Sequence, residues 1–313
     1  MLKTELCDLV GIEYPIFQGG MARISDGKLA AAVSEAGGLG IVSAASGDVE
    51  QIAGEMDIAA KLTSKPIGVN IMLRGSNIDE IAAMIAEKKP AVVTTGAGSP
   101  EKYMDMWKSA GIKVIPVAAS AAYAKLFERA GADAVIAEGG ESGGHIGELT
   151  TMALVPQVCD AVSIPVIAAG GIADGRGAAA ALMLGACGIQ VGTRFLLAEE
   201  CSISRVYKDK LIKANDTSTV VTGRRLGHPV RSLKSKFSRE YSRIEYTSIS
   251  DEELEQFAVG SLGAAVTGDE NHGCFLAGQI SGIVNKEQPA AEIIREIFEQ
   301  AEALLTGGTK WVK

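Results

Sequence analysis

The chain has 313 residues, and its 30 basic and 38 acidic side chains give a formal net charge of −8 at pH 7, which argues against a nucleic-acid partner. Hydrophobic residues make up 47% of the chain and aromatic residues 5%, with 37 glycines, a composition typical of α/β proteins and not of disordered chains. Five scattered cysteines without a C-x-x-C pair exclude a disulfide framework and a zinc site, and no apolar run has the length of a membrane helix, so we expect a cytoplasmic protein with no metal centre and no membrane contact.

Eight short apolar runs recur along the chain, and each is followed by a helical pattern of alanine, leucine and charged residues. The runs are residues 15–20, 39–44, 66–72, 91–98, 113–120, 134–140, 165–171 and 188–193. Because they are apolar on both faces, they indicate parallel strands buried between helices and a core. Eight such strand and helix units predict a closed TIM (β/α)8 barrel.

The helices between these strands carry recognisable start and stop signals. Residues 25–38 read "SDGKLAAAVSEAGG", in which Ser25 or Asp26 can cap the helix start and Gly37 and Gly38 can end it. Residues 99–111, 120–132 and 289–305 have similar amphipathic patterns. These segments predict helices that cover the outside of the barrel.

The pattern changes after the eighth strand. Residues 202–273 carry more charge and more Ser and Thr, and they show no further β–α repeat, which predicts a smaller, mostly helical insertion. We therefore expect a barrel over residues 1–201, an insertion over 202–273 that lines the substrate entrance, and a C-terminal segment over 274–313 that returns to the barrel.

Glycines follow the seventh and eighth strands, at the end of the barrel where active sites lie. Gly170 and Gly171 end one strand, and Gly192 and Thr193 end the next. In TIM barrels these two strand ends commonly hold a phosphate with backbone amides and a helix N-terminus. The alternative is that the glycines serve only tight strand-to-helix turns.

Two amides lie at the ends of apolar strands. Asn70 and Gln190 can each donate to and accept from a flat heterocycle, although either could instead be a satisfied polar residue of the barrel interior. With the phosphate site, they outline flavin mononucleotide (FMN). Gly20, Met21 and Glu138 end other strands on the same predicted rim and join the cofactor-binding set.

The segment "AEGGESGGHIG", residues 137–147, holds five glycines and a histidine. We interpret the glycines, Gly143 among them, as letting a loop lie flat against a planar ring, with His145 placed over it. A histidine there can exchange a proton near neutral pH or hydrogen-bond a carbonyl oxygen, so His145 is the candidate catalytic residue, although it could simply stabilise the loop. His228 and His272 are interpreted as structural or solvent-exposed, with a role in shaping the substrate entrance as the alternative.

The chain resembles a known family over nearly its whole length. The resemblance rests on "YPIFQGGM", "AAAVSEAGGLGIV", "KPIGVNIML", "VVTTGAGSPEKYM", "GADAVIAEGGESGGHIG", "IPVIAAGGIADG" and "IQVGTRF". These motifs resemble bacterial enoyl-acyl carrier protein reductase II, within the nitronate monooxygenase superfamily. The resemblance implies an FMN-dependent barrel that passes a hydride from NADH or NADPH to a trans-2-enoyl thioester.

The same resemblance implies site residues and partners. FMN would be held by Met21, Asn70, Gly143, Gly171, Gln190, Gly192 and Thr193. His145 would lie near the enoyl carbonyl. Acyl carrier protein would present the substrate, and the basic stretch from Arg224 to Arg239 is a candidate docking face for it. The resemblance also implies stimulation by a monovalent cation and leaves a homodimer and the choice between NADH and NADPH open.

Two other functions compete with the reductase. Nitronate monooxygenases oxidise alkyl nitronates with FMN and oxygen on the same barrel, but they typically carry glutamine where this chain has Glu138. A second negative charge beside the flavin would disfavour an anionic nitronate. Arg23 and Ile24 depart from the aromatic pair that many relatives carry after "GGM". The other alternative is a barrel that binds a flavin or phosphate without catalysis.

Overall fold

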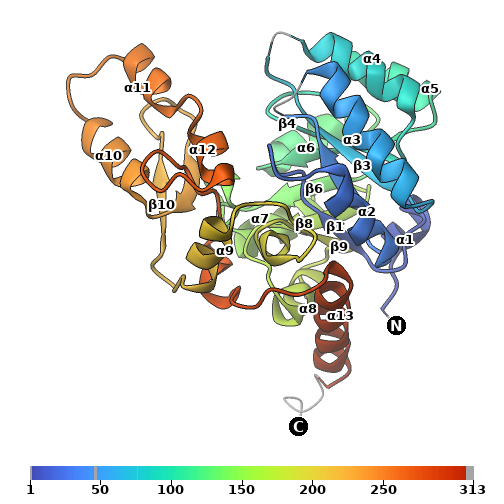
Figure 1. Ribbon diagram of the computed structural model, residues 1–313. Coiled ribbons are helices and arrows are strands. Elements are labelled where there is room, and N and C mark those ends of the chain that lie inside the picture. The colour runs from blue at the N-terminus through green and yellow to red at the C-terminus, as the bar shows by residue number, and fades with distance from the viewer. Residues whose placement is uncertain (1, 46–47, 76, 308–313) are drawn as a thin grey trace.

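The barrel predicted from the sequence is confirmed by a computed structural model, which describes residues 2–45, 48–75 and 77–307 (Figure 1). Eight parallel strands run in the order β1-β9-β8-β6-β5-β4-β3-β2. Leu39, just before β2, bridges to Phe17 in β1 and joins the two ends of the sheet. The strands are β1 (Ile16–Gln18), β2 (Gly40–Ser43), β3 (Ile67–Met72), β4 (Val92–Gly96), β5 (Lys113–Ala118), β6 (Val135–Glu138), β8 (Val166–Ala169) and β9 (Gly188–Val191).

Helices cover the outside of the barrel in the predicted alternation. They are α2 (Gly27–Glu35), α3 (Val49–Leu62), α4 (Ile78–Lys88), α5 (Glu101–Ser109), α6 (Ala121–Arg129), α7 (Thr151–Cys159) and α8 (Gly175–Met183). The C-terminal helix α13 (Ala290–Thr306) packs between α8 and α2 and occupies the eighth helix position (Figure 1). Asp26, one of the two predicted caps, accepts the Leu29 amide hydrogen at 2.9 Å and starts α2.

Two apolar layers hold the barrel together. The interior layer includes Phe17, Ile41, Ile115, Ile136 and Ile167, and the short helix α1 (Glu5–Val10) closes the amino ends of the strands with Leu6 and Val10. A larger layer fills the space between the strands and the outer helices. Because side chains alternate along a strand, the residues two positions after these interior residues also face inward, at the carboxyl ends of the strands.

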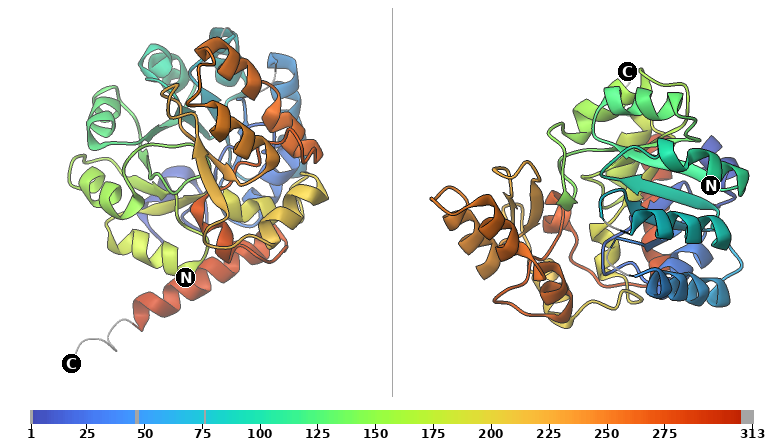
Figure 2. Two further views of the ribbon diagram at one scale, coloured as in Figure 1. Left: turned by 90° about the vertical axis from the view of Figure 1, so that its left-hand side faces the viewer. Right: turned by 90° about the horizontal axis from the view of Figure 1, so that it is seen from above.

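A separate lobe stands at that end of the barrel (Figures 1 and 2). It contains α9 (Arg205–Ile212), β10 (Thr219–Thr222), β11 (Val230–Leu233), α10 (Lys236–Ile244), α11 (Asp251–Ala258) and α12 (Ser261–Thr267). The chain enters it through η1 (Thr193–Leu197) and leaves it through η2 (Gln279–Ile283). Phe237, Tyr241, Leu254 and Cys274 form its own small core.

The lobe also contains a sheet that the sequence did not predict. Strands β10 and β11 pair antiparallel, and β11 pairs with β7 (Gly144–His145), which belongs to the glycine-rich segment after β6. The insertion is therefore joined to the barrel by backbone hydrogen bonds at the predicted active-site segment. Its boundaries as a domain stay a prediction, and residues 1, 46–47, 76 and 308–313 of the expected ranges lie outside the described residues.

Among the described residues, none of the helices combines the length and the apolar character needed to cross a bilayer.

Because α2 packs tightly against β2, we expect two glycine substitutions to differ greatly in their effect on the free energy of unfolding. A Cβ atom added at Gly40 would lie 1.8 Å from the carbonyl oxygen of Ala30, whereas one at Gly54 in α3 would meet nothing within 4 Å. We expect Gly40→Ala to destabilise the protein by about 3 kcal/mol or more, because the backbone of α2 must move. Gly54→Ala should stabilise it by about 0.5–1 kcal/mol through helix propensity. Urea unfolding of both variants checks this, and equal midpoints would contradict it.

Candidate active site

Polar side chains line the inside of the barrel at the carboxyl ends of the strands. Glu138 follows the interior residue Ile136 by two positions, and Gln190, Asn70 and Thr94 occupy equivalent inward positions on β9, β3 and β4. The strand register places Glu138 opposite Ala169, and Ala169 opposite Gln190. These polar residues therefore form one ring above the apolar interior.

The two side-chain amides predicted to contact a ligand, those of Asn70 and Gln190, differ in whether the protein already hydrogen-bonds them. The Thr94 hydroxyl donates to Asn70 Oδ1 at 2.9 Å, and Asn70 Nδ2 donates to the Gly20 carbonyl at 3.4 Å. Gly20 is required here, because an added Cβ would lie 2.2 Å from Asn70 Cβ. Gln190 is 9% exposed, and its side chain makes no hydrogen bond to the described residues. Its amide is free to bind a ligand.

Several glycines of residues 137–147 have a packing role of their own. A Cβ at Gly139 would lie 2.1 Å from Thr151 Oγ1, and one at Gly143 would lie 2.7 Å from the Ala277 backbone. Gly144 has φ +81°, which suits glycine, just where β7 begins. These glycines let the segment approach α7 and the returning chain, so their presence does not require a planar ring beside them.

The glycines of the predicted phosphate site differ in how tightly the protein packs around them. Gly170 has φ +86°, and a Cβ there would lie 2.7 Å from the Gly139 carbonyl oxygen, so packing explains it. Around Gly171 and Gly192 there is more room, with the nearest atoms 3.4 Å away on Glu141 and 3.8 Å away on Met21. Among the described residues, no protein acceptor takes the amide hydrogen of either glycine. Both amides are therefore available to an anion.

Thr193 and Met21 lie beside these glycines. The Thr193 hydroxyl accepts the Gly278 amide hydrogen at 2.9 Å and keeps its own hydrogen for a further acceptor. Met21 is held by its amide, which donates to Ser25 Oγ at 2.8 Å, and its side chain lies next to Gly192. Arg23, in the segment that departs from relatives, has φ +61°.

Half-buried Glu138 and buried Ser142 lie close together at the barrel mouth. Burial raises the pKa of the Glu138 carboxyl to about 7, an effect that the nearby Ser142 hydroxyl partly opposes. Ser142 is buried, and its Oγ has no hydrogen-bond partner among the described residues. Close to neutral pH this carboxyl can therefore hold a proton.

The raised pKa of Glu138 predicts a pH-dependent stability. In the unfolded chain the carboxyl ionises near the ordinary glutamate pKa of 4.5, but in the folded protein it stays protonated up to about pH 7. The folded state thus binds more protons between these pH values. The stability that protonated Glu138 gives the folded protein is therefore complete below pH 4.5 and falls by up to about 3 kcal/mol as the pH rises to 7. Glu138→Gln removes the titration. Unfolding of ligand-free protein at several pH values should show the wild type losing stability relative to the variant, and parallel profiles would contradict the assignment.

His145 is placed by the lobe sheet. It forms the end of β7 and pairs with Val230 of β11, and its side chain is exposed. The protein atoms that surround the ring lower the pKa of His145 by partial desolvation, and the nearby His228 and Arg74 lower it further electrostatically. His145 is therefore a neutral imidazole at physiological pH, a state that donates a hydrogen bond more readily than a proton.

His228 has a closer connection to the site than the sequence suggested. Arg74, after β3, donates from Nη1 to His228 Nδ1 at 3.2 Å, and Ile146 donates its amide hydrogen to Pro229 at 3.0 Å. The turn between β10 and β11 therefore lies over the predicted active-site segment. His272, in contrast, is exposed and contacts Asp269 at 2.8 Å within the lobe.

Much of the basic stretch from Arg224 to Arg239 is used within the fold. Arg231 is 9% exposed and donates to the Gly140 carbonyl at 3.0 Å, which ties the lobe to the glycine-rich segment. Arg225 contacts Asp251 at 2.7 Å and donates to three backbone carbonyls. Arg224 contacts Glu148 at 3.3 Å. The exposed charge of this stretch is carried mainly by Lys234, Lys236 and Arg239.

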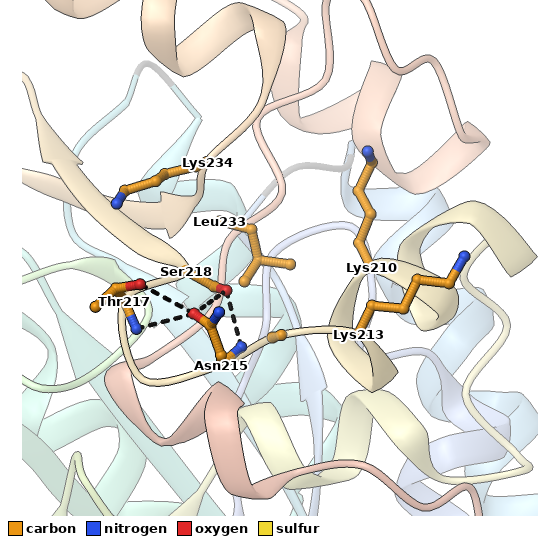
Figure 3. Close-up of a pocket in the computed structure, with 8 residues that line it drawn as sticks. Lys210, Lys213, Asn215, Thr217, Ser218, Leu233 and Lys234 are labelled. Atoms are coloured by element: carbon orange, nitrogen blue, oxygen red, sulfur yellow. Dashed lines mark hydrogen bonds between the residues drawn. The ribbon is translucent and has the colours of Figure 1, made fainter.

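Two cavities lie away from the strand ends that carry the predicted residues. One, of about 330 Å³, is in the lobe and is lined by Lys210, Lys213, Ala214, Asn215, Thr217, Ser218, Leu233 and Lys234 (Figure 3). Asn215, Thr217 and Ser218 hydrogen-bond to one another at its edge. The other, of about 240 Å³, lies between α3 and α12. Within the described residues, no group of three or more His, Cys, Asp or Glu side chains could hold a metal ion.

Comparison with known proteins identifies relatives along the whole chain. The sequence pattern of the nitronate monooxygenase family matches residues 3–87 and 75–300. A probable nitronate monooxygenase from Staphylococcus aureus (strain MSSA476) is 33% identical over 97% of this chain and 98% of its own length. The solved structure of FabK from Thermotoga maritima is 46% identical, with a TM-score of 0.97 and complete coverage of both chains. A nitroalkane oxidase from Streptomyces ansochromogenes is 29% identical, with a TM-score of 0.87 over 96% of this chain and 99% of that one.

Proposed function

Because the chain belongs to the nitronate monooxygenase family, we propose that it is an FMN-dependent enoyl-acyl carrier protein reductase of the FabK type within that family. It is an oxidoreductase of this superfamily. The proposal adds the reaction: a hydride from NADH or NADPH is delivered through the flavin to the β-carbon of a trans-2-enoyl thioester, and a proton is added to the α-carbon. The observation that carries it is the 46% identity to FabK across the entire chain, with Glu138 at the barrel mouth.

The residues at the barrel mouth fit FMN. The free amides of Gly171 and Gly192 and the Thr193 hydroxyl would hold the phosphate. Asn70 and Gln190 face inward on the polar ring and would bind the edge of the flavin. When bound, FMN would accept two electrons from the nicotinamide and return them to the thioester.

His145 and Glu138 have complementary properties for this chemistry. Neutral His145 would donate a hydrogen bond to the thioester carbonyl and stabilise the negative charge that grows on its oxygen when the β-carbon is reduced. Glu138 holds a proton near neutral pH, inside the mouth and beside the expected flavin position. Uncharged groups there suit a neutral enoyl substrate.

Nitronate oxidation remains the second candidate. Curated relatives from Staphylococcus aureus carry the name probable nitronate monooxygenase at 32–33% identity, and a nitroalkane oxidase shares the fold at 29%. The positive charge of Arg74 near His145 would favour an anionic nitronate. The lower identity and Glu138 favour the reductase.

One experiment separates the candidates. Purified protein is supplied with NADH or NADPH and crotonyl thioester, and nicotinamide oxidation is followed without oxygen. We expect oxidation that depends on the thioester. Oxygen consumption with alkyl nitronate but no thioester reduction would establish the monooxygenase, and bound FMN without either turnover would indicate a binding protein. Protein that is colourless and takes up no FMN would contradict the flavin assignment itself.

The partners follow from the reductase proposal. Acyl carrier protein would present the enoyl chain, and its acidic character suits the exposed Lys234, Lys236 and Arg239 of the Arg224 to Arg239 stretch. Stimulation by a monovalent cation, assembly as a homodimer and a cytoplasmic location belong to the same proposal.

A further inference from the structure

Arg74 and His228 form a cationic pair that the proposed chemistry does not use. Arg74 follows β3 on the barrel, and His228 lies on the turn between β10 and β11 of the lobe. Their side chains meet at 3.2 Å, and both residues are exposed. The pair therefore bridges the barrel and the lobe at a surface that a ligand can reach.

This pair lies next to the candidate catalytic residue. Val230, two residues after His228, pairs with His145, and Pro229 accepts the Ile146 amide hydrogen at 3.0 Å. Both His228 and Arg74 are close enough to the His145 ring to lower its pKa electrostatically. A molecule bound at His145 would therefore lie close to Arg74 and His228.

The charge of Arg74 has no acidic counterpart in the protein. Arg224, four residues before His228, contacts Glu148 at 3.3 Å, but among the described residues no carboxylate forms an ion pair with Arg74, although the chain carries a net charge of −8. Arginine only donates, so His228 Nδ1 accepts in this contact, and Nε2 is left to donate to another group. The pair therefore presents guanidinium and imidazole donors without an acceptor to satisfy them.

We propose that Arg74 and His228 form a subsite for a phosphate or diphosphate group of the substrate that reaches His145. The inference rests on the proposed function, which brings two molecules with such a group to this mouth. One is the nicotinamide dinucleotide, and the other is the phosphopantetheine arm of the thioester. A planar guanidinium binds phosphate oxygens in pairs, and the imidazole Nε2–H adds a third donor.

The direct test measures binding of inorganic pyrophosphate by calorimetry. Arg74→Gln removes the charge but keeps a donor for His228 Nδ1, so the contact between barrel and lobe can persist. Lys213→Gln is the control, because it removes one positive charge from the lobe cavity of Figure 3 and leaves this pair intact. We expect the dissociation constant to rise about tenfold or more in Arg74→Gln and His228→Asn, to recover in part in Arg74→Lys, and to stay unchanged in Lys213→Gln.

Kinetics then identify the source of the phosphate. A higher KM for NADPH and NADH in Arg74→Gln assigns the dinucleotide, and a higher KM for crotonyl-coenzyme A assigns the pantetheine arm. Crotonyl-N-acetylcysteamine, which lacks phosphate, should show an unchanged KM in every variant. Equal pyrophosphate affinity in wild type and Arg74→Gln, or an equal loss in Lys213→Gln, would overturn the subsite. If the wild type reduces no thioester but pyrophosphate binding still depends on Arg74, the proposed function fails and the subsite stands.

Discussion

Replacement of His145 with alanine should slow enoyl-thioester reduction by about a hundredfold or more, with FMN content unchanged. The imidazole is placed to stabilise charge on the thioester oxygen, and removal of one such donor typically costs two to three orders of magnitude in rate. The fold should survive, because β7 pairs with β11 through its backbone and the His145 side chain is exposed. Single-turnover reduction of crotonyl thioester by the pre-reduced enzyme measures the affected step.

The matched control is His272→Ala, which removes another exposed histidine of the same protein. Among the described residues, the His272 side chain hydrogen-bonds to Asp269, and its removal should leave the rate unchanged. His145→Gln keeps an N–H donor and should recover part of the activity, because the lowered pKa of His145 makes the ring a hydrogen-bond donor rather than an acid. Wild-type turnover in His145→Ala would remove this residue from the mechanism.

The strands of the barrel could be predicted because each signal is local. All eight apolar runs contain an observed strand, and Asp26 caps α2 as its position before an alanine-rich segment suggests. A run that is apolar on both faces describes a buried parallel strand without knowledge of its neighbours. Eight repeats of this unit then leave few alternatives to a closed barrel.

The sheet of the lobe could not be predicted, because its pairing is not local. β10 and β11 are four residues each. β7, which pairs with β11, has only two residues and lies in a glycine-rich segment far earlier in the chain. No periodicity is measurable over such lengths. For the same reason the sequence around His228 and Pro229 does not predict that the pairing of Val230 with His145 brings this turn close to the site. The sequence also does not predict whether an acidic side chain pairs with Arg74, because that depends on residues far apart in the chain.

The glycines at the strand ends are explained by two different causes. A ligand contact and a close approach of two backbones both require a missing side chain, so the pattern alone does not separate them. The structure gives Gly139, Gly143 and Gly170 a clash with the chain itself, but it leaves space at Gly171 and Gly192. The phosphate prediction therefore depends mainly on the last two residues.

Because Gly171 has space around it, we expect Gly171→Asp to lose FMN. Gly171 has φ +73°, a conformation that Asp and Asn tolerate better than most residues, and an added Cβ would have its nearest neighbours on Glu141, with Cβ at 3.4 Å and Oε1 at 3.5 Å, so there is space for either side chain. A carboxylate there would face the phosphate dianion, and like charges about 4 Å apart repel by about 4 kcal/mol in a partly buried site. We expect FMN affinity to fall at least about a hundredfold.

Gly171→Asn is the control that isolates the charge, because it has the same size and backbone preference as Asp. It should keep much of the FMN that Gly171→Asp loses, and Gly170→Asn should instead destabilise the protein, since a Cβ there lies 2.7 Å from the Gly139 carbonyl oxygen. Flavin absorbance of the purified variants and titration of FMN into the stripped proteins measure both effects. If Gly171→Asp binds FMN as the wild type does, the phosphate lies elsewhere, and the amides of Gly171 and Gly192 have another purpose.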